Sequence, residues 1–233
     1  MPYIPPRHVT QHWNVTKPSA SGKRGVVVSQ ARDAALAGVA VLEAGGNAVD
    51  AAVATAFALA TMEPWNSGLG GIGFAMVQMA GEAKARMVDF GPVSPRHLSP
   101  ANFRLTGRMT TELFRWEGVE GDANIHGPLS VAVPSSVAGY EKLHGTWGRL
   151  PLAEVMAPAV ALARRGLPVD WFSTLKILGS ASVLAKYPES ARIYLRDGLP
   201  PQPPADGSAS YIVQGRLADT LERLGHAGLR DYY

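Results

Sequence analysis

The sequence predicts a mixed α/β (α+β) fold in which paired helices lie beside an antiparallel sheet. Residues 33–61 contain 12 alanines, and their larger apolar residues recur at helical spacing, which is typical of buried, closely packed helices. Residues 74–79 and 85–90 are two apolar runs separated by a turn, the pattern of a β-hairpin. The length of 233 residues and the hydrophobic content of 46% indicate one large domain or two small ones with a substantial core.

Proline and glycine divide the N-terminal half into short elements. The expected elements are, in order, an extended arm over residues 1–24, a buried strand at Gly25–Ser29, and helices over 34–44 and from 48 to about Thr61. Asp33 and Asn47 precede the two helices and can cap them, because their side chains accept hydrogen bonds from the free N–H groups of a first turn. Gly45-Gly46 and Glu63-Pro64 are expected to end the two helices.

Helices dominate the expected structure of the C-terminal half. Residues 91–123 have many turn formers and little periodicity, which predicts a long excursion from the core. The further expected elements are a strand over 129–133, a helix from Ser135 or Ser136 to about Gly145, a helix over 152–165 with Pro158 as a break or fresh start, a helix over 170–187, a proline-rich crossover over 199–206 and a helix over 215–228. On the 170–187 helix, Trp171, Leu175, Leu178 and Val183 lie roughly on one face.

Composition excludes several classes of function. The chain has no Cys, so disulfides, thiolate metal sites and a Cys nucleophile are excluded. Its 22 Lys and Arg against 19 Asp and Glu form no basic run longer than two residues, which predicts no nucleic-acid partner. The longest apolar stretch, 48–62, is shorter than the ~20 residues of a membrane span, which predicts no membrane partner. Because residues 1–18 lack an apolar signal segment and Cys is absent, we expect a cytoplasmic location.

The glycine-rich segment Gly68–Gly73 has the letters of a dinucleotide-binding motif. A helix is expected before it and a strand after it, the reverse of the order that such a site requires. We therefore expect a tight turn and no cofactor. The histidines at zinc-like spacing, His8 and His12, lie in the arm without an acidic neighbour, so no metal is predicted. No Gly-x-Ser-x-Gly motif is present to indicate a local Ser–His–Asp triad.

One histidine lies where site residues are often found. His126, two residues after Asn124, is placed where a loop enters the expected strand over 129–133, and such loops commonly carry functional side chains. An ordinary turn histidine hydrogen-bonded to the backbone is the simpler interpretation.

Four stretches of the sequence carry a family resemblance. They are Gly25–Ser29 with Leu42–Ala54; Glu63–Phe74; Val88–Phe90 with Pro95, Val131–Pro134 and Val137–Gly139; and Pro158–Val160 with Leu162–Gly166, Leu217–Leu221 and Asp231–Tyr233. In this order they resemble the N-terminal part of the gamma-glutamyltransferase (gamma-glutamyltranspeptidase) family. Gly-Gly-Asn-Ala-Val-Asp-Ala-Ala and Ser-Gly-Leu-Gly-Gly are its most specific motifs, and the resemblance covers about residues 24–233.

The resemblance implies an N-terminal-nucleophile hydrolase with an αββα sandwich, of which residues 25–233 form part of a single domain. It implies a precursor that cuts itself before a Thr, whose α-amino group can then act as base. This chain corresponds to the large-subunit portion and is expected to contain no catalytic nucleophile. The implied partners are a small subunit carrying the Thr and a small-molecule amide substrate, and a higher oligomer is left open.

Two positions depart from the family pattern. Gly91 stands where true gamma-glutamyltransferases have an Arg that holds the substrate α-carboxylate, and Ser135 stands where Gly is usual, a change that the turn is expected to tolerate. Phe90, Gly91, Arg96, Asn124 and His126 are the predicted substrate-binding residues, and Arg96 or His126 could replace the lost anion site. The loss of Arg makes the chain more similar to the acylase- and amidohydrolase-like members. A genuine gamma-glutamyltransferase and a non-catalytic binding subunit are the alternatives.

Overall fold

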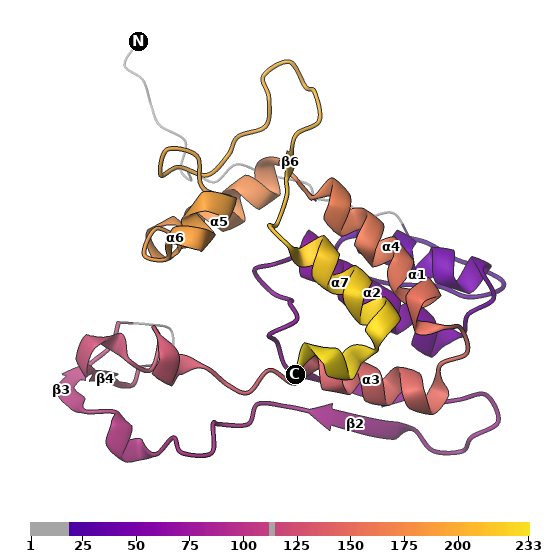
Figure 1. Ribbon diagram of the computed structural model, residues 1–233, viewed down its shortest axis with the longest axis horizontal. Helices are drawn as coiled ribbons and strands as arrows, with labels where there is room; N and C mark the ends of the chain where they lie inside the picture. Colours follow the sequence, from indigo (N-terminus) through magenta and orange to yellow (C-terminus); the bar gives the residue numbers. More distant parts are fainter. Residues whose placement is uncertain (1–18, 112–114) are drawn as a thin grey trace, which may run out of the picture.

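The computed structural model describes residues 19–111 and 115–233 (Figure 1). Most of the expected arm over 1–24, including His8 and His12, lies outside these ranges; residues 19–24 are exposed. The largest core is helical, with α2 packed against α1 and α4, and α4 packed against α7. The bounds of these four helices are α1 Arg32–Glu43, α2 Ala48–Met62, α4 Leu152–Arg165 and α7 Leu217–Ala227.

The start of α2 confirms the predicted cap. The Asn47 side chain accepts hydrogen bonds from the amides of Val49 and Asp50, and the Asp50 carboxylate accepts one from the Asn47 amide at 2.9 Å. Apolar side chains cover nearly the whole circumference of α2, with Phe57 fully buried. The helix ends at Met62, with Glu63 as its C-cap before Pro64, as expected.

The predicted cap of α1 is wrong. The helix begins at Arg32 after Ala31, which makes no side-chain capping bond. Asp33 therefore lies inside the first turn, where its carboxylate forms an ion pair with Arg165 of α4. Gly45 ends the helix in the left-handed region, with φ of 97°, as predicted.

The predicted hairpin is present beside these helices. Strands β1 (Gly73–Val77) and β2 (Arg86–Phe90) pair antiparallel, with Gly73 opposite Phe90. Alternate residues, among them Ala75, Val77 and Val88, pack against the helical core. Helix α3 (Ser136–Trp147), expected to begin at Ser135 or Ser136, runs alongside β2 (Figure 1).

A second, smaller core holds the segment after α4. It contains β5 (Leu167–Pro168), β6 (Tyr211–Ile212), α5 (Trp171–Leu184) and α6 (Pro188–Tyr194). The Asp170 side chain caps α5 by accepting from the Ser173 amide at 2.7 Å. The expected helix over 170–187 thus ends three residues early, and α6 was not anticipated.

Two predicted strands are wrong. Val26 and Val28 are 60% and 86% exposed and lie in no strand. Over the expected strand 129–133, the chain forms a 3₁₀ turn at Pro128–Ser130 and one isolated bridge between Val93 and Val133. A strand requires a hydrogen-bonded neighbour. Within the described part of the chain, neither segment forms a continuous ladder of hydrogen bonds with another strand.

The excursion over 91–123 contains a small hairpin that the sequence analysis did not anticipate. Strands β3 (Leu105–Met109) and β4 (Glu117–Val119) pair antiparallel with an irregular register, in a lobe that lies away from the helical core (Figure 1). The remaining 3₁₀ turns are Pro100–Asn102, Glu120–Asp122 and Leu229–Tyr232.

Helix α4 continues through Pro158 without a break, so the predicted bounds hold and the predicted interruption does not. Within the described ranges no helix has the length and apolar character needed to cross a bilayer.

Candidate functional site

The predicted site residue Phe90 joins the hairpin to α3 at the end of β2. Its ring lies so close to Gly139 that an added Cβ there would come within 2.4 Å of it. The ring also meets Tyr140 edge-on, with 5.8 Å between centroids, and Tyr140 meets Phe57 at 5.0 Å. Burial raises the pKa of the Tyr140 phenol. This aromatic chain fixes the end of β2 against the core.

Gly91 follows directly, and its backbone is held by its own strand. The Gly91 amide donates to Asp89 Oδ1 at 2.8 Å. Its φ is not in the left-handed region, so the position does not require glycine for its conformation. A Cβ at Gly91 would lie 3.0 Å from Asp89 Oδ1, the mobile end of a side chain.

Ser135, just before α3, holds the Phe90–Gly91 backbone from the opposite side. Its hydroxyl donates to the Phe90 carbonyl at 2.6 Å and lies 3.3 Å from the Gly91 carbonyl oxygen. The amides of Ser135 and Ser136 both donate to the Gly71 carbonyl at 3.0 Å. The start of α3 therefore ties the glycine-rich turn to the end of β2, which gives Ser135 a role that the sequence analysis missed.

Tyr233 holds the start of α3 through two hydrogen bonds of its hydroxyl. Its hydroxyl donates to the Pro134 carbonyl at 2.9 Å and accepts from the Ala138 amide at 3.1 Å. An amide in the first turn of a helix has no partner within the helix, and Tyr233 supplies one here.

A groove of about 680 Å³ lies between the end of β2 and α3. It is lined by Phe74, Val88, Asp89, Phe90, Gly91, Pro92, Val93, Ser135, Ala138, Gly139 and Lys142. Most of these groups are apolar, and the charged ones are the Asp89 carboxylate and the Lys142 ammonium. Ser135, Gly139 and Lys142 recur at helical spacing, a signal in the sequence that could have identified this face.

The predicted site residues are not all brought together. Phe90 and Gly91 line the groove, whereas Arg96, Asn124 and His126 do not. His126 instead lies beside the turn after α5, with Nδ1 3.3 Å from the Tyr187 hydroxyl and Nε2 3.4 Å from Lys186 Nζ. Substrate binding by these five residues stays a prediction.

The described residues offer little local catalytic machinery. Within 19–111 and 115–233 no three His, Asp or Glu side chains are grouped so as to hold a metal ion. The histidine hydrogen bonds over the same ranges go to Leu150, Lys186 and Tyr187, and none joins a Ser or Thr hydroxyl. Within the described residues, no activated hydroxyl therefore lies beside the groove.

Comparison with known proteins identifies the family. The gamma-glutamyltranspeptidase family model matches residues 34–233. The chain belongs to this family. It is 37% identical over 216 residues to the acylase ACY 1 proenzyme of Pseudomonas sp. (strain SE83), covering 91% of this chain and 36% of that protein. It is 32% identical over 215 residues to the glutathione hydrolase proenzyme of Escherichia coli (strain K12), covering 91% and 34%.

The solved structures agree with the sequence relatives. The crystal structure of Helicobacter pylori gamma-glutamyltranspeptidase superposes with a TM-score of 0.75 at 28% identity, over 91% of this chain and 56% of that one. The predicted fold class is therefore confirmed: this gamma-glutamyltranspeptidase-family chain has the mixed α/β fold of the large-subunit portion of an N-terminal-nucleophile hydrolase. The chain spans about a third of the length of the curated relatives that it matches.

Proposed function

We propose that this chain is the large-subunit part of an enzyme that cleaves an amide by acyl transfer. The acyl group passes to an N-terminal Thr carried by a complementary segment, and then to water or an amine. The observation that carries the proposal is the groove at the end of β2, found in a chain of this family. The groove provides a shaped binding surface, and the complementary segment provides the reacting hydroxyl.

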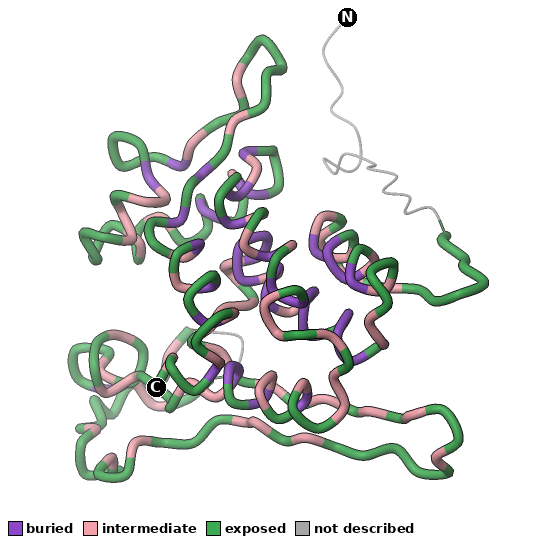
Figure 2. Tube along the Cα trace, turned by 45° about the vertical axis from the view of Figure 1, so that its right-hand side comes forward, coloured by how far each residue is buried: buried purple, intermediate pink, exposed green. Residues whose placement is uncertain are grey.

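The outer face of the hairpin supports a complementary segment. Phe74, Met76 and Met87 alternate along β1 and β2 and are 72%, 74% and 62% exposed. In Figure 2 the hairpin is coloured as exposed and intermediate, whereas most of the buried residues lie in the helices. Because a sheet with an apolar face is stable when another layer covers it, a second sheet of the αββα sandwich is the layer that fits this face.

The substrate proposed for the groove is an acyl amide that lacks the free α-carboxylate of a γ-glutamyl group. Arg–carboxylate pairs are bidentate and strong, and Gly91 leaves this position of the groove without such a donor. The similarity to the acylase ACY 1 proenzyme favours this class of donor. A glutathione-hydrolase activity is the second candidate, favoured by the 32% identity to the Escherichia coli protein.

The test is to produce the chain together with the coding sequence that follows it and to determine the N-terminus of every polypeptide by mass spectrometry. The proposal predicts self-cleavage before a Thr and turnover of acyl anilides. A complete protein that stays uncleaved and inactive would indicate a non-catalytic binding subunit.

The proposed cytoplasmic location is tested on the same protein by cell fractionation, and recovery from a secreted or periplasmic pool would contradict it.

A further inference from the structure

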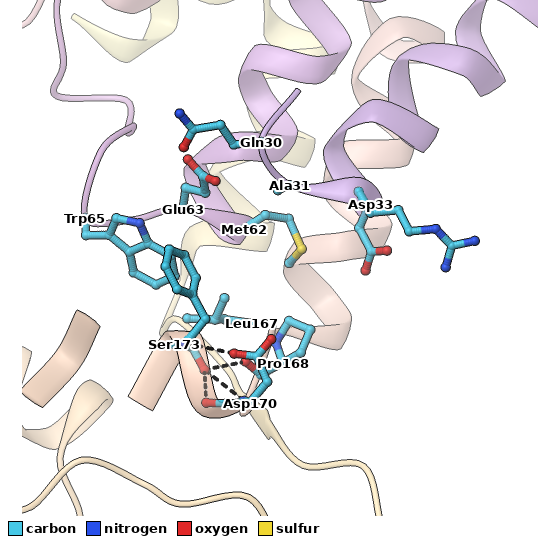
Figure 3. Close-up of a pocket in the computed structure, with 12 residues that line it drawn as sticks. Gln30, Ala31, Asp33, Met62, Glu63, Trp65, Leu167, Pro168, Asp170 and Ser173 are labelled. Atoms are coloured by element: carbon cyan, nitrogen blue, oxygen red, sulfur yellow. Dashed lines mark hydrogen bonds between the residues drawn. The ribbon is translucent and has the colours of Figure 1, made fainter. Parts of the chain in front are cut away.

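A second cavity lies apart from the groove, where the segment before α1, the end of α2 and the start of α5 meet. Its volume is about 270 Å³, and its walls include Gln30, Asp33, Glu63, Trp65, Asp170 and Phe172 (Figure 3). None of these residues lines the groove at Gly91, so the chemistry of this cavity stands independently of the proposed acyl transfer.

Glu63 places a buried carboxylate at the cavity, without a partner in the described part of the chain. The residue is 6% exposed, and within the described residues its carboxylate makes no hydrogen bond or ion pair. The other two carboxylates are satisfied, since Asp33 pairs with Arg165 and Asp170 accepts from the Ser173 amide. The exposed side chain of Arg32 also lines the cavity but forms no ion pair with Glu63. A buried charge is stable when an opposite charge or a set of donors faces it.

Trp65 adds an unused donor and an aromatic wall. Its indole Nε1 is buried and finds no acceptor in the described part of the chain, although buried indole N–H groups usually have one. Its ring meets that of Phe172 edge-on, with 5.7 Å between centroids. Figure 3 shows Glu63 next to Trp65 at one end of the cavity, away from the Asp170–Ser173 hydrogen bonds.

We propose that this cavity binds a small organic ammonium ion that also carries an acceptor oxygen, as an amino alcohol does. The cation faces the Glu63 carboxylate and the two aromatic rings, which attract positive charge through their π-electrons. The oxygen accepts the Trp65 N–H. Water alone could bridge both groups, but it brings no charge to balance Glu63.

The test uses choline and its uncharged isostere 3,3-dimethyl-1-butanol on the complete protein labelled with 5-fluorotryptophan. Fluorine NMR follows the Trp65 resonance, assigned by its loss in Trp65→Phe. Choline is expected to shift it saturably with a millimolar Kd, and the isostere to bind at least tenfold more weakly. Equal binding of the two probes, or no response of this resonance to either, would overturn the proposal and leave a water-filled or covered cavity.

Two variants locate the charge recognition. Glu63→Gln should reduce the preference for choline over the isostere to about onefold, whereas the exposed control Glu154→Gln should leave it unchanged. If Glu63→Gln does not fold, Phe172→Leu is used in its place. Loss of one ring should weaken the binding of choline several-fold and the binding of the isostere less. A full choline preference in folded Glu63→Gln, or in Phe172→Leu, would contradict the assigned site.

Discussion

The helical layer and the hairpin differ in how far this chain completes them. Helices α1, α2, α4 and α7 bury one another, and Phe57, Met156, Leu221 and Leu224 are fully buried between them. The β1–β2 hairpin has apolar side chains on both faces, but among the described residues one face is covered and the other is exposed. Helix α5 resembles the hairpin, since its face with Leu175 and Leu178 is more than half exposed.

The helical layer is stabilised by contacts within this chain, whereas the outer face of the hairpin needs a further layer to bury its apolar side chains. Helices satisfy their backbone hydrogen bonds internally, whereas strands need neighbours. The candidate groove lies at the boundary between the two regions, on a hairpin that the helices support from one side. Substitutions in the two regions should therefore affect different measurements.

Phe57→Ala should cause the largest loss of stability. Truncating a fully buried Phe costs about 3–5 kcal/mol of the free energy of unfolding. Its matched control, Phe74→Ala on the outer hairpin face, should cost less than about 1 kcal/mol in residues 1–233 alone. Urea unfolding followed by circular dichroism measures both. Similar losses for the two variants would break the proposed difference between the regions.

Asp50→Ala should cost about 2–4 kcal/mol, because the carboxylate is buried and accepts several backbone hydrogen bonds. Its oxygens join the start of α2 to the Arg149 amide at 3.0 Å and the Leu150 amide at 3.4 Å. The exposed Asp206→Ala serves as the control and should stay within about 0.5 kcal/mol of the parent protein. Thermal unfolding of the three proteins decides the outcome.

Gly91→Arg should raise kcat/KM for a γ-glutamyl anilide about tenfold in the complete enzyme, by restoring a carboxylate-binding guanidinium. The backbone at Gly91 accepts a side chain without strain, as its φ shows. Gly145→Arg, on α3 with open space around it, adds the same charge outside the groove and should have no effect. A parent enzyme that already uses the γ-glutamyl donor with micromolar KM would refute the assigned donor class.

Ser135→Ala should have the smallest effect, raising KM about fivefold with a lesser change in kcat, which corresponds to about 1 kcal/mol for one hydrogen bond. The physical reason is a looser Phe90–Gly91 backbone. Ser135→Thr should restore much of the binding, and Ser130→Ala, whose hydroxyl bonds to Gly127 within its own turn, should behave like the parent. An unchanged KM in Ser135→Ala would remove Ser135 from the positioning of the groove.

Local sequence signals predicted most of the helices, although not α6, and were insufficient for isolated strands. Alanine spacing and the Asn47 cap predicted α2 because a helix depends on its own residues. Gly25–Ser29 has the composition of a buried strand, but its partner would have to come from another part of the protein. At Pro158, the packing of α4 against α2 and α7 outweighs the local preference for a break.

The groove could be predicted only in part. Phe90 and Gly91 came from the family resemblance, and both line it. Arg96 and His126 were predicted as replacements for the lost anion site, and His126 also for its place where a loop enters an expected strand. Neither reason determines where a loop without regular structure places the side chain. Ser135 and Lys142 share helical spacing with Gly139, but that spacing alone does not show that the face lines a groove until α3 is packed against β2.

The most direct test of the central claim compares residues 1–233 alone with the same chain produced together with its complementary segment. Amide hydrolysis, solubility and thermal unfolding are measured on both. The account predicts that the chain alone is inert and prone to associate through its uncovered hairpin face, and that the complete protein is soluble and active with a Thr N-terminus. Turnover by a soluble monomer of residues 1–233 would show that the nucleophile lies within this chain and would contradict the account.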